Sequence, residues 1–413
     1  MTRPGGAPDH AGRLTDRPGD RYTILALILA AQTVANVGPL GIPAIASVIR
    51  ADLGLTLTQA GSFLSAYYVG PILMSLPAGA MADRWGVKRT LVLGQVVIAL
   101  GLGAVAASGS YGVLIPLMIF AGFGYGMLNP TSTKAVMGWF PPRQRATVVG
   151  LKQVGLPFGG VLGAALLPAL ALALGWRFAV VVSAALIALG AIASLAIYRD
   201  APDYAPPAKA PGERSPVSAV LGNRDLWLVG LSTLVFAGMQ TVWMAFLALY
   251  LQGVVGLTLL GASRYLALAQ FGGMTGRVVF GVLSDRTFGG RRRAPLAIAG
   301  CGSALCSLAI AFTGAGASAL WLTALALVFG FVGIGWNGVQ HTLMAELAGP
   351  RSAGTALGMG LAISSLGVTL GPLVFGWCVE WAGGYRGPWI GLALVMAGGL
   401  GLLALVRERP RVA

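Results

Sequence analysis

The stretch that decides the fold is Gly79 to Arg89, GAMADRWGVKR, a short basic loop between two long apolar runs. Its first part returns 202 positions later (79 to 281) as GVLSDR, from Gly281 to Arg286, again after an apolar run. The second copy leads into the basic cluster 291–293. A loop that repeats at a fixed distance predicts that the chain contains two copies of one structural unit.

Other segments repeat in the same order along the chain. Gln32-Thr33-Val34 recurs as Gln240-Thr241-Val242, 208 positions later (32 to 240), and Asn129 pairs with Asn337 at the same distance. Matches at shared offsets do not accumulate in this way by chance, so the duplication covers most of the chain. Between the two copies, charged residues and prolines interrupt the apolar pattern over 199–226, which predicts a polar linker.

The composition excludes a soluble protein. Of 413 residues, 56% are hydrophobic and only 10% are charged, against about 25% charged in soluble domains. The net charge of +15 would suggest nucleic-acid binding in a soluble protein, but here the basic residues lie in short loops between apolar runs, so no nucleic-acid partner is expected. The three cysteines lie in apolar runs without metal-binding spacing, and neither a metal nor another cofactor is expected.

The apolar runs are long enough to cross a bilayer, which takes about 20 residues per helix. They predict an all-α membrane protein with cytoplasmic tails at 1–21 and 407–413, helical bundles at 22–198 and 226–406, and a linker at 199–225. Twelve runs are found, at about 22–48, 58–81, 90–109, 112–138, 147–173, 176–198, 226–252, 261–284, 294–314, 319–345, 354–379 and 388–406.

The distribution of basic residues predicts the orientation. With the N-terminus inside, 21 of the 28 Lys and Arg residues fall on the cytoplasmic side, four on the opposite side and three within spans. The positive-inside rule therefore places both termini in the cytoplasm. Ala44-Ile45-Ala46 also resembles a signal-peptide cleavage site, but cleavage there would leave eleven spans and delete part of the repeat.

The repeated loop resembles the signature of the major facilitator superfamily, and the resemblance covers about residues 20–408. It implies two pseudo-symmetric bundles of six transmembrane helices, a monomer among membrane lipids, and alternating access around a central cavity. The residues that match the family's loop motif are Gly79, Asp83, Arg84, Gly86, Lys88 and Arg89, with a weaker second copy at Gly281, Asp285, Arg286 and Gly289.

The motif also has a mechanical interpretation. A carboxylate at one helix end accepts hydrogen bonds from the free N–H groups that open a neighbouring helix. By the resemblance, Asp83 docks on residues 352–355 at the start of span eleven, and Asp285 docks on 144–147 at the start of span five. Such contacts close the cytoplasmic side and break when it opens. The alternative is that both loops are solvated turns that only set orientation.

Basic residues inside the spans indicate the substrate. Arg277, Lys152 and Lys134 lie within predicted spans, whereas no acidic residue lies in the middle of one. An ionised group in the bilayer requires a partner, so the natural counter-charge is an anionic substrate. Arg277 is the strongest candidate, with Gln270 on the same helical face; the alternative is that Arg277 bonds to helix carbonyls. Lys152 either reaches the cavity or extends to the cytosol, and Lys134 is expected to extend to the cytosol.

Polar side chains in other spans are further candidates for substrate binding. In isolation each is better explained by helix-to-helix hydrogen bonding, but their recurrence in spans one, four, seven and ten favours a shared cavity for the set. His341 either carries a coupling proton or is a hydrogen-bonded structural residue. The candidates are Gln32, Asn36, Tyr68, Tyr125, Asn129, Gln240, Trp243, Asn337, Gln340 and His341.

The sequence of span eight narrows the function. Gly276-Arg277 followed by Ser284-Asp285-Arg286 resembles nitrate, oxalate/formate and monocarboxylate transporters, whereas Gly155 to Gly160 departs from the drug/proton antiporter pattern. We therefore expect a secondary transporter of a small anion in a bacterial cytoplasmic membrane, working by proton symport or anion exchange. The alternative is an exporter of neutral or amphiphilic compounds. An enzyme is not expected, because the spans offer no catalytic acid–base or nucleophilic pair.

Overall fold

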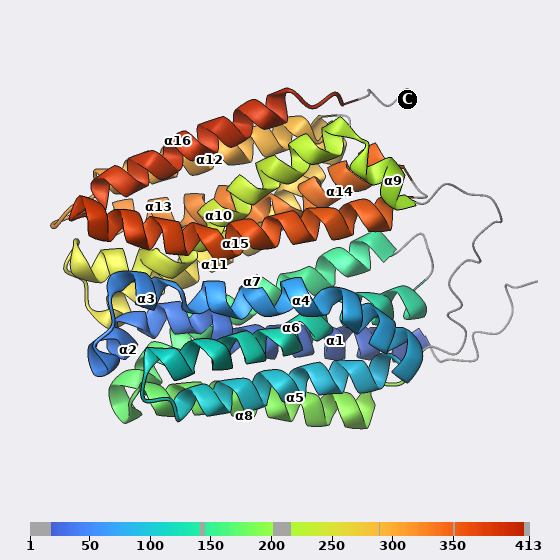
Figure 1. Ribbon diagram of the computed structural model, residues 1–413, viewed down its shortest axis with the longest axis horizontal. Helices are drawn as coiled ribbons and strands as arrows, with labels where there is room; N and C mark the ends of the chain where they lie inside the picture. Colours follow the sequence, from blue (N-terminus) through green and yellow to red (C-terminus); the bar gives the residue numbers. More distant parts are fainter. Residues whose placement is uncertain (1–17, 141–144, 201–215, 289, 350–351, 409–413) are drawn as a thin grey trace, which may run out of the picture.

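Long α-helices make up nearly all of the computed structural model, which describes residues 18–140, 145–200, 216–288, 290–349 and 352–408 (Figure 1). Helices satisfy every backbone N–H and C=O group within one segment, as a bilayer requires. The elements of the first half are α1 (Pro18–Gly41), η1 (Ile42–Ile45), α2 (Ala46–Leu53), α3 (Leu57–Gly61), α4 (Phe63–Trp85), α5 (Val87–Ala106), α6 (Tyr111–Trp139), α7 (Arg145–Leu174) and α8 (Trp176–Ile197).

The second half repeats this order, with a short helix in front. Span ten is interrupted by a π-helical turn, η4, and a second π-helical turn, η3, follows α11. The elements are α9 (Pro216–Leu221), α10 (Arg224–Gly253), α11 (Leu259–Val282), η3 (Leu283–Thr287), α12 (Arg293–Ala311), α13 (Ala319–Phe329), η4 (Gly330–Ile334), α14 (Asn337–Ala348), α15 (Ala353–Ala382) and α16 (Arg386–Ala404).

Ten helical segments of the described residues are both long and apolar enough to cross a bilayer. The two other predicted spans are α4 and α11. In α4 the apolar stretch found among the described residues covers only Phe63–Met74. In α11, 24 residues are long enough, but Arg264, Gln270 and Arg277 lower the mean hydropathy. The less apolar span α11 is also the one that carries the strongest substrate-site candidate.

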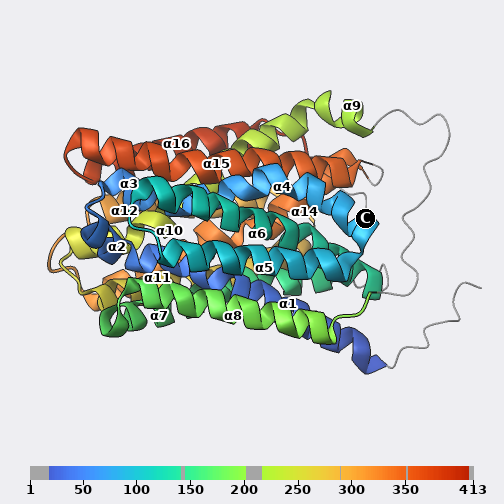
Figure 2. The ribbon, with the colours of Figure 1, turned by 60° about the horizontal axis from the view of Figure 1, so that its bottom comes forward.

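The helix packing repeats with the sequence. In the first half α1 packs on α7 and α5 packs on α8; in the second half α10 packs on α15 and α12 packs on α16, which are the equivalent pairs. The contacts between the halves are equivalent as well, because α11 packs on α7 and α15 packs on α4. Figures 1 and 2 show the two halves side by side, with the long helices nearly parallel. The duplication therefore extends from the sequence to the helix contacts.

Glycines permit the closest of these contacts. A methyl group on Gly122 of α6 would lie 1.9 Å from the carbonyl oxygen of Tyr67 in α4. A methyl group on Gly163 of α7 would lie 2.2 Å from the carbonyl oxygen of Val37 in α1. Since membrane helices associate through close packing rather than through exclusion of water, these positions exclude any larger residue.

A pair of acidic residues caps equivalent helices in the two halves. Asp200, just past α8, accepts a hydrogen bond from the N–H of Lys88 at the start of α5, at 3.1 Å. Glu408, just past α16, accepts from the N–H groups of Arg292 and Arg293 at the start of α12. The two carboxylates are 208 positions apart (200 to 408), the main offset of the repeat. In each half, therefore, a carboxylate near the end of the last helix caps the N-terminus of another helix.

Candidate functional site

A cavity of about 1200 Å³ lies between the two halves. Its walls come from α4, α6 and α7 on one side and from α10, α11, α14 and α15 on the other. It extends to Val149 and Gly150, near the start of α7, and to Glu346 and Gly349, at the end of α14. These residues lie at the end of the molecule where α1 begins and α16 ends, here called the terminal end (Figure 1). The cavity therefore opens at the terminal end.

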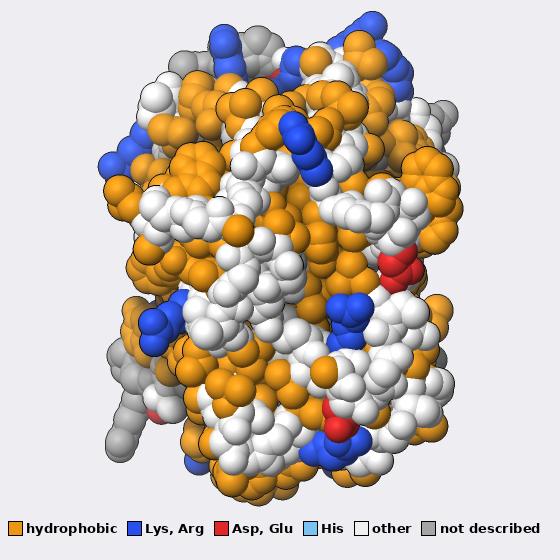
Figure 3. All heavy atoms as spheres, turned by 90° about the vertical axis from the view of Figure 1, so that its left-hand side faces the viewer, with side chains coloured by type: hydrophobic (Ala, Val, Ile, Leu, Met, Phe, Trp, Pro, Cys, Tyr) orange, Lys and Arg blue, Asp and Glu red, His pale blue; other side chains and the backbone are white. Residues whose placement is uncertain are grey.

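The opposite end, shown in Figure 3, is closed by contacts between the halves. Ser47 Oγ donates to Gln252 Oε1 at 2.7 Å, and the N–H of Thr58 donates to Glu380 Oε1 at 2.7 Å. The ring of Phe246 fits against Gly61, where an added methyl group would lie 2.2 Å from Cζ. Because these contacts join α2 and α3 to α10 and α15, the opposite end opens only if they break.

Arg277 of α11 lines the cavity and also forms a hydrogen bond from the second half to the first. Its Nη1 donates to the backbone oxygen of Gln153 in α7 at 2.9 Å, so the alternative prediction of a carbonyl contact is met. That bond uses one of the five N–H donors of a guanidinium. Nε is buried without a partner, and within the described part of the chain no carboxylate pairs with this arginine. The group retains donors for a ligand.

Two tyrosines and an asparagine form the wall of the first half. The rings of Tyr68 in α4 and Tyr125 in α6 meet edge to face, with centroids 5.9 Å apart. Asn129 follows Tyr125 by one turn, and all three line the cavity. Arg277 lines the same cavity from the second half. The predicted faces of spans two and four thus meet Arg277 across the cavity.

The facing wall comes from Gln240 of α10 and from α14. The amide Nδ2 of Asn337 donates to Gln240 Oε1 at 3.2 Å and to the backbone oxygen of Ile334 at 3.1 Å. Ile334 ends η4, where the helical hydrogen-bond pattern changes and leaves a carbonyl for a side chain. His341 lies one turn beyond Asn337 and also lines the cavity. The interruption of span ten therefore positions this wall.

Lys152 is completely buried and reaches neither the cavity nor the solvent, which corrects both alternatives drawn from the sequence. Its Nζ donates to the backbone oxygen of Asn129 at 3.1 Å, to Asn129 Oδ1 at 3.0 Å and to Thr133 Oγ1 at 2.7 Å. An ammonium has three N–H donors, and these bonds use all three. Lys152 is therefore held in place directly behind Asn129.

Trp243 was predicted to line the cavity, and the structure shows that this is wrong. Its ring stacks on Phe329, with centroids 3.8 Å apart, and its Nε1 donates to Ser307 Oγ at 2.9 Å. The indole therefore belongs to the core of the second half. A polar N–H in an apolar span requires a partner, and here the partner is a neighbouring helix.

Gln270 was predicted to share the cavity with Arg277, and this is also wrong. It is fully buried where α11 packs on α7, and an added methyl group on Gly160 would lie 2.6 Å from its Nε2. Seven residues separate it from Arg277, or about 10 Å along the helix. The two side chains share a helical face, but the halves are already in contact at the level of Gln270.

Three other predicted residues are buried behind the cavity walls. Gln32 donates to Ser132 Oγ at 3.3 Å and to Asn129 Oδ1 at 3.5 Å. Asn36 donates to the backbone oxygen of Gln32 at 2.7 Å, and Gln340 lies buried beside Gly360 of α15. Gln32 bonds to a neighbouring helix, as that alternative predicts. The bond of Asn36 stays within α1, and the amide of Gln340 has no hydrogen-bond partner among the described residues.

The cavity also has polar residues that the sequence search missed. Gln153 of α7, Ser364 and Ser365 of α15, and Thr342 and Glu346 of α14 line it. Gln153, Ser364 and Ser365 lie in spans five and eleven, outside the spans one, four, seven and ten in which polar residues recur, whereas Thr342 and Glu346 lie near the end of span ten. The polar pairs Lys152-Gln153 and Ser364-Ser365 in otherwise apolar runs were the available indication.

The loop motif is described only in part. Gly86 has a φ of +87°, which an L side chain rarely adopts, and it forms the turn between α4 and α5. Lys88 begins α5 under the Asp200 cap, while Arg89 and Arg286 are exposed. The side chains of Asp83, Arg84 and Asp285 lie outside the described part of the structure, as do most of their predicted docking partners. Their gating role stays a prediction.

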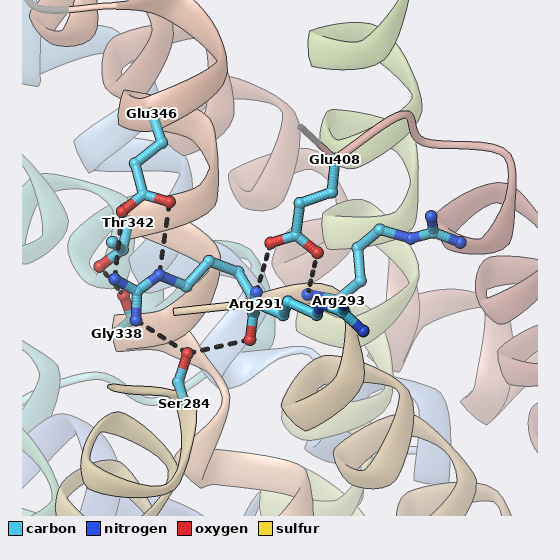
Figure 4. Close-up of polar contacts among 8 residues, drawn as sticks. Ser284, Arg291, Arg293, Gly338, Thr342, Glu346 and Glu408 are labelled. Carbon is cyan, nitrogen blue, oxygen red and sulfur yellow. Dashed lines mark hydrogen bonds and ion pairs between the residues drawn. The ribbon is translucent and has the colours of Figure 1, made fainter. Parts of the chain in front are cut away.

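A polar network at the terminal end belongs to the second half alone (Figure 4). Arg292 Nη2 lies 3.1 Å from Glu346 Oε1, and Arg292 Nη1 donates to Ser284 Oγ at 2.8 Å. Ser284 in turn donates to the backbone oxygen of Arg291 at 3.2 Å. These bonds tie η3, α12 and α14 together beside the mouth of the cavity. They hold the end of the second half together and leave the cavity open between the halves.

Comparison with known proteins identifies the family. The Major Facilitator Superfamily pattern matches residues 24–364, and the chain belongs to this superfamily. It is thus a secondary transporter and not an enzyme, and the predicted membrane fold is confirmed. The crystal structure of a bacterial homologue of the human lysosomal transporter Spinster, in an inward-facing and unoccupied conformation, superposes with a TM-score of 0.80 at 19% identity, covering 95% of this chain and 98% of that one.

Two similar proteins are named as transporters of organic anions. The hexuronate transporter of Bacillus subtilis is 25% identical over 403 residues, and the alignment covers 93% of each chain. A probable sulfoacetate transporter, SauU, of Cupriavidus necator is 28% identical over 407 residues, again with 93% of each chain covered. These relatives agree with the resemblance of span eight to anion transporters at the level of the family.

Proposed function

We propose that the protein carries a small organic anion across a bacterial cytoplasmic membrane by alternating access. The observation that carries the proposal is Arg277, whose guanidinium projects into the cavity with no carboxylate partner among the described residues. A planar guanidinium matches a carboxylate or sulfonate with two parallel hydrogen bonds. The hexuronate and sulfoacetate named for the two relatives are anions of this kind.

The positive charge of the site supports the proposal. Lys152 lies behind Asn129 on the wall that faces Arg277, and neither cation is paired with a described carboxylate. Cations in a low-dielectric environment are costly unless an opposite charge approaches them. An anion in the cavity supplies that charge, whereas a cationic or neutral solute does not.

The conformation fits one step of the transport cycle. If the basic loops lie in the cytoplasm, both termini are cytoplasmic and the cavity faces inward. Outward opening then requires loss of the Ser47–Gln252 and Thr58–Glu380 contacts and closure of the terminal end, where the gating motif lies. Proton symport and anion exchange both fit this cycle, and His341, in the cavity wall, is the candidate proton carrier.

A ligand panel tests the proposal. The purified protein is heated with D-glucuronate, D-gluconate, sulfoacetate or the cationic dye rhodamine 6G, and the unfolding temperature is measured against ligand concentration. A ligand that binds only the folded protein raises this temperature. We expect at least one anion to stabilise the protein and the dye not to; stabilisation by the dye alone would reject the anion proposal in favour of an exporter of amphiphiles.

A further inference from the structure

Asn129 and Asn337 occupy equivalent positions in the two halves and both line the cavity, yet their hydrogen bonds differ. We propose that the structure locks the two amides in opposite orientations, so that Asn129 offers N–H donors and Asn337 offers an oxygen acceptor to one ligand, a hydroxylated carboxylate. The inference rests on the proposed anion transport and specifies the substrate class.

The orientation of Asn129 follows from the chemistry of Lys152. An ammonium only donates hydrogen bonds, so the amide atom 3.0 Å from Lys152 Nζ must be the oxygen. Gln32 Nε2 donates to the same oxygen at 3.5 Å. Nδ2 of Asn129 is left without a bond to any described residue and is not buried, and the side chain lines the cavity. Asn129 therefore presents its two amide N–H groups to the ligand.

The orientation of Asn337 follows from the backbone of η4. A carbonyl oxygen only accepts, so the amide atom 3.1 Å from the oxygen of Ile334 must be Nδ2. The same nitrogen donates to Gln240 Oε1 at 3.2 Å. Oδ1 of Asn337 has no bond to a described residue and is not buried. Asn337 therefore presents an acceptor where its counterpart in the first half presents donors.

A ligand that pairs with both asparagines needs a hydrogen-bond acceptor for Asn129 and a hydrogen-bond donor for Asn337. The N–H groups of Asn129 and the guanidinium of Arg277 suit a carboxylate. The oxygen of Asn337 requires a donor, which a hydroxyl group supplies and a hydrocarbon chain or nitrate does not. Closure of the cavity on a ligand without a hydroxyl would leave this oxygen buried and unpaired, which weakens binding.

Lys152 is then a positioning residue. It touches no ligand in this arrangement and acts by fixing the amide of Asn129. Its three bonds to Asn129 and Thr133 also join α7 to α6, so a purely structural role is the competing explanation. The two roles predict different results when Lys152 is replaced. Only the positioning role predicts that folded variant protein binds the ligand more weakly.

The experiment compares hydroxylated carboxylates, D-gluconate and D-glucuronate, with hexanoate, which has six carbons and no hydroxyl, by calorimetric titration of the purified full chain. In the wild type we expect at least one hydroxylated acid to bind about tenfold or more tightly than hexanoate. Asn337→Leu should reduce that ratio toward one. Equal affinity for hexanoate and both hydroxylated acids would overturn the inference while leaving anion transport standing. If none of these three acids binds, the inference is overturned, and anion transport is rejected as well if sulfoacetate also fails to bind.

The Lys152 arm uses two variants. Lys152→Met should weaken binding of both carboxylate classes about tenfold in protein that is folded by size-exclusion chromatography. Lys152→Arg keeps a donor for Asn129 Oδ1 and should recover a large part of the affinity. Unchanged affinity in folded Lys152→Met protein would show that Lys152 only stabilises the fold and would overturn its positioning role. If neither Lys152 variant folds, Asn129→Leu, which removes the proposed donors, replaces them and should give the same loss.

Discussion

Asp200 and Glu408 make the same contact in the two halves of the protein, each as a carboxylate on the N-terminus of a helix in its own half. They are separated by 208 residues, which is also the distance from Asn129 to Asn337. The caps have kept one role, whereas the asparagines have acquired opposite orientations. The duplication therefore preserves the frame of each half, and the two halves differ in the cavity wall.

The caps are expected to stabilise the folded protein. Removing the acceptor in Asp200→Ala should lower the unfolding temperature by more than Asp200→Asn, because asparagine keeps an oxygen for the N–H of Lys88. The carboxylate at a helix N-terminus contributes about 0.3 to 1 kcal/mol. Thermal unfolding in detergent shows which variant has the lower unfolding temperature. Equal unfolding temperatures for wild type, Asp200→Asn and Asp200→Ala would argue against the cap.

The contact between Thr58 and Glu380 is expected to hold the opposite end closed. Glu380→Gln keeps the shape and removes the charge, so the open form should gain about two- to fivefold in population. The measurement is the rate at which a maleimide labels a cysteine at Ser263, which is buried in this interface, in a background without native cysteines.

Arg177→Gln is the matched control for this experiment. Arg177 pairs with Asp52 at 2.7 Å at the same end of the molecule, but both residues belong to the first half. Its loss should leave the labelling rate unchanged. If Arg177→Gln and Glu380→Gln raise the rate equally, the effect reflects surface charge and not a contact between the halves.

The loop motif is expected to close the terminal end in the other conformation. Asp83→Asn should weaken a carboxylate–helix contact of about 0.3 to 2 kcal/mol and so favour the conformation with the terminal end open. A cysteine at Ser364, on the cavity wall in α15, should then be labelled faster by a maleimide that enters from the terminal end. Unchanged labelling together with unchanged transport would remove Asp83 from the gate.

The sequence predicts the fold well because the features that define the fold are local. Each can be recognised in one segment of the chain by itself. Apolar runs, the repeat and the loop motif define the helices without knowledge of their contacts. The depth of Arg277 was also predictable, since eight residues separate it from Asp285 at the helix end. In each of these cases one helix contains all the information that is needed.

The site was predictable only in part because a cavity depends on which helix lies opposite. Periodicity places Gln270 and Arg277 on the same face of α11, two turns apart. Only the packing of α7 on α11 shows that Gln270 is covered. Periodicity likewise cannot show that Ser307 satisfies the indole of Trp243, or that Lys152 turns toward α6. Asp200 and Glu408 are also separated by the 208-residue offset of the repeat. They lie in polar segments, however, where matches between the two copies are hard to recognise.

Arg277 carries the central claim, and its variants test it most directly. The measurement is anion affinity and unfolding temperature on the same purified Arg277→Lys and Arg277→Ala proteins, with exposed Arg264→Ala on the same helix as the control for lost charge. We expect Arg277→Ala to lose about 2 to 5 kcal/mol of binding free energy, with Arg277→Lys intermediate, Arg264→Ala near wild type, and stability reduced only by the single bond to Gln153. An Arg277→Ala protein that is unstable yet binds the anion as tightly as the wild type would contradict the claim.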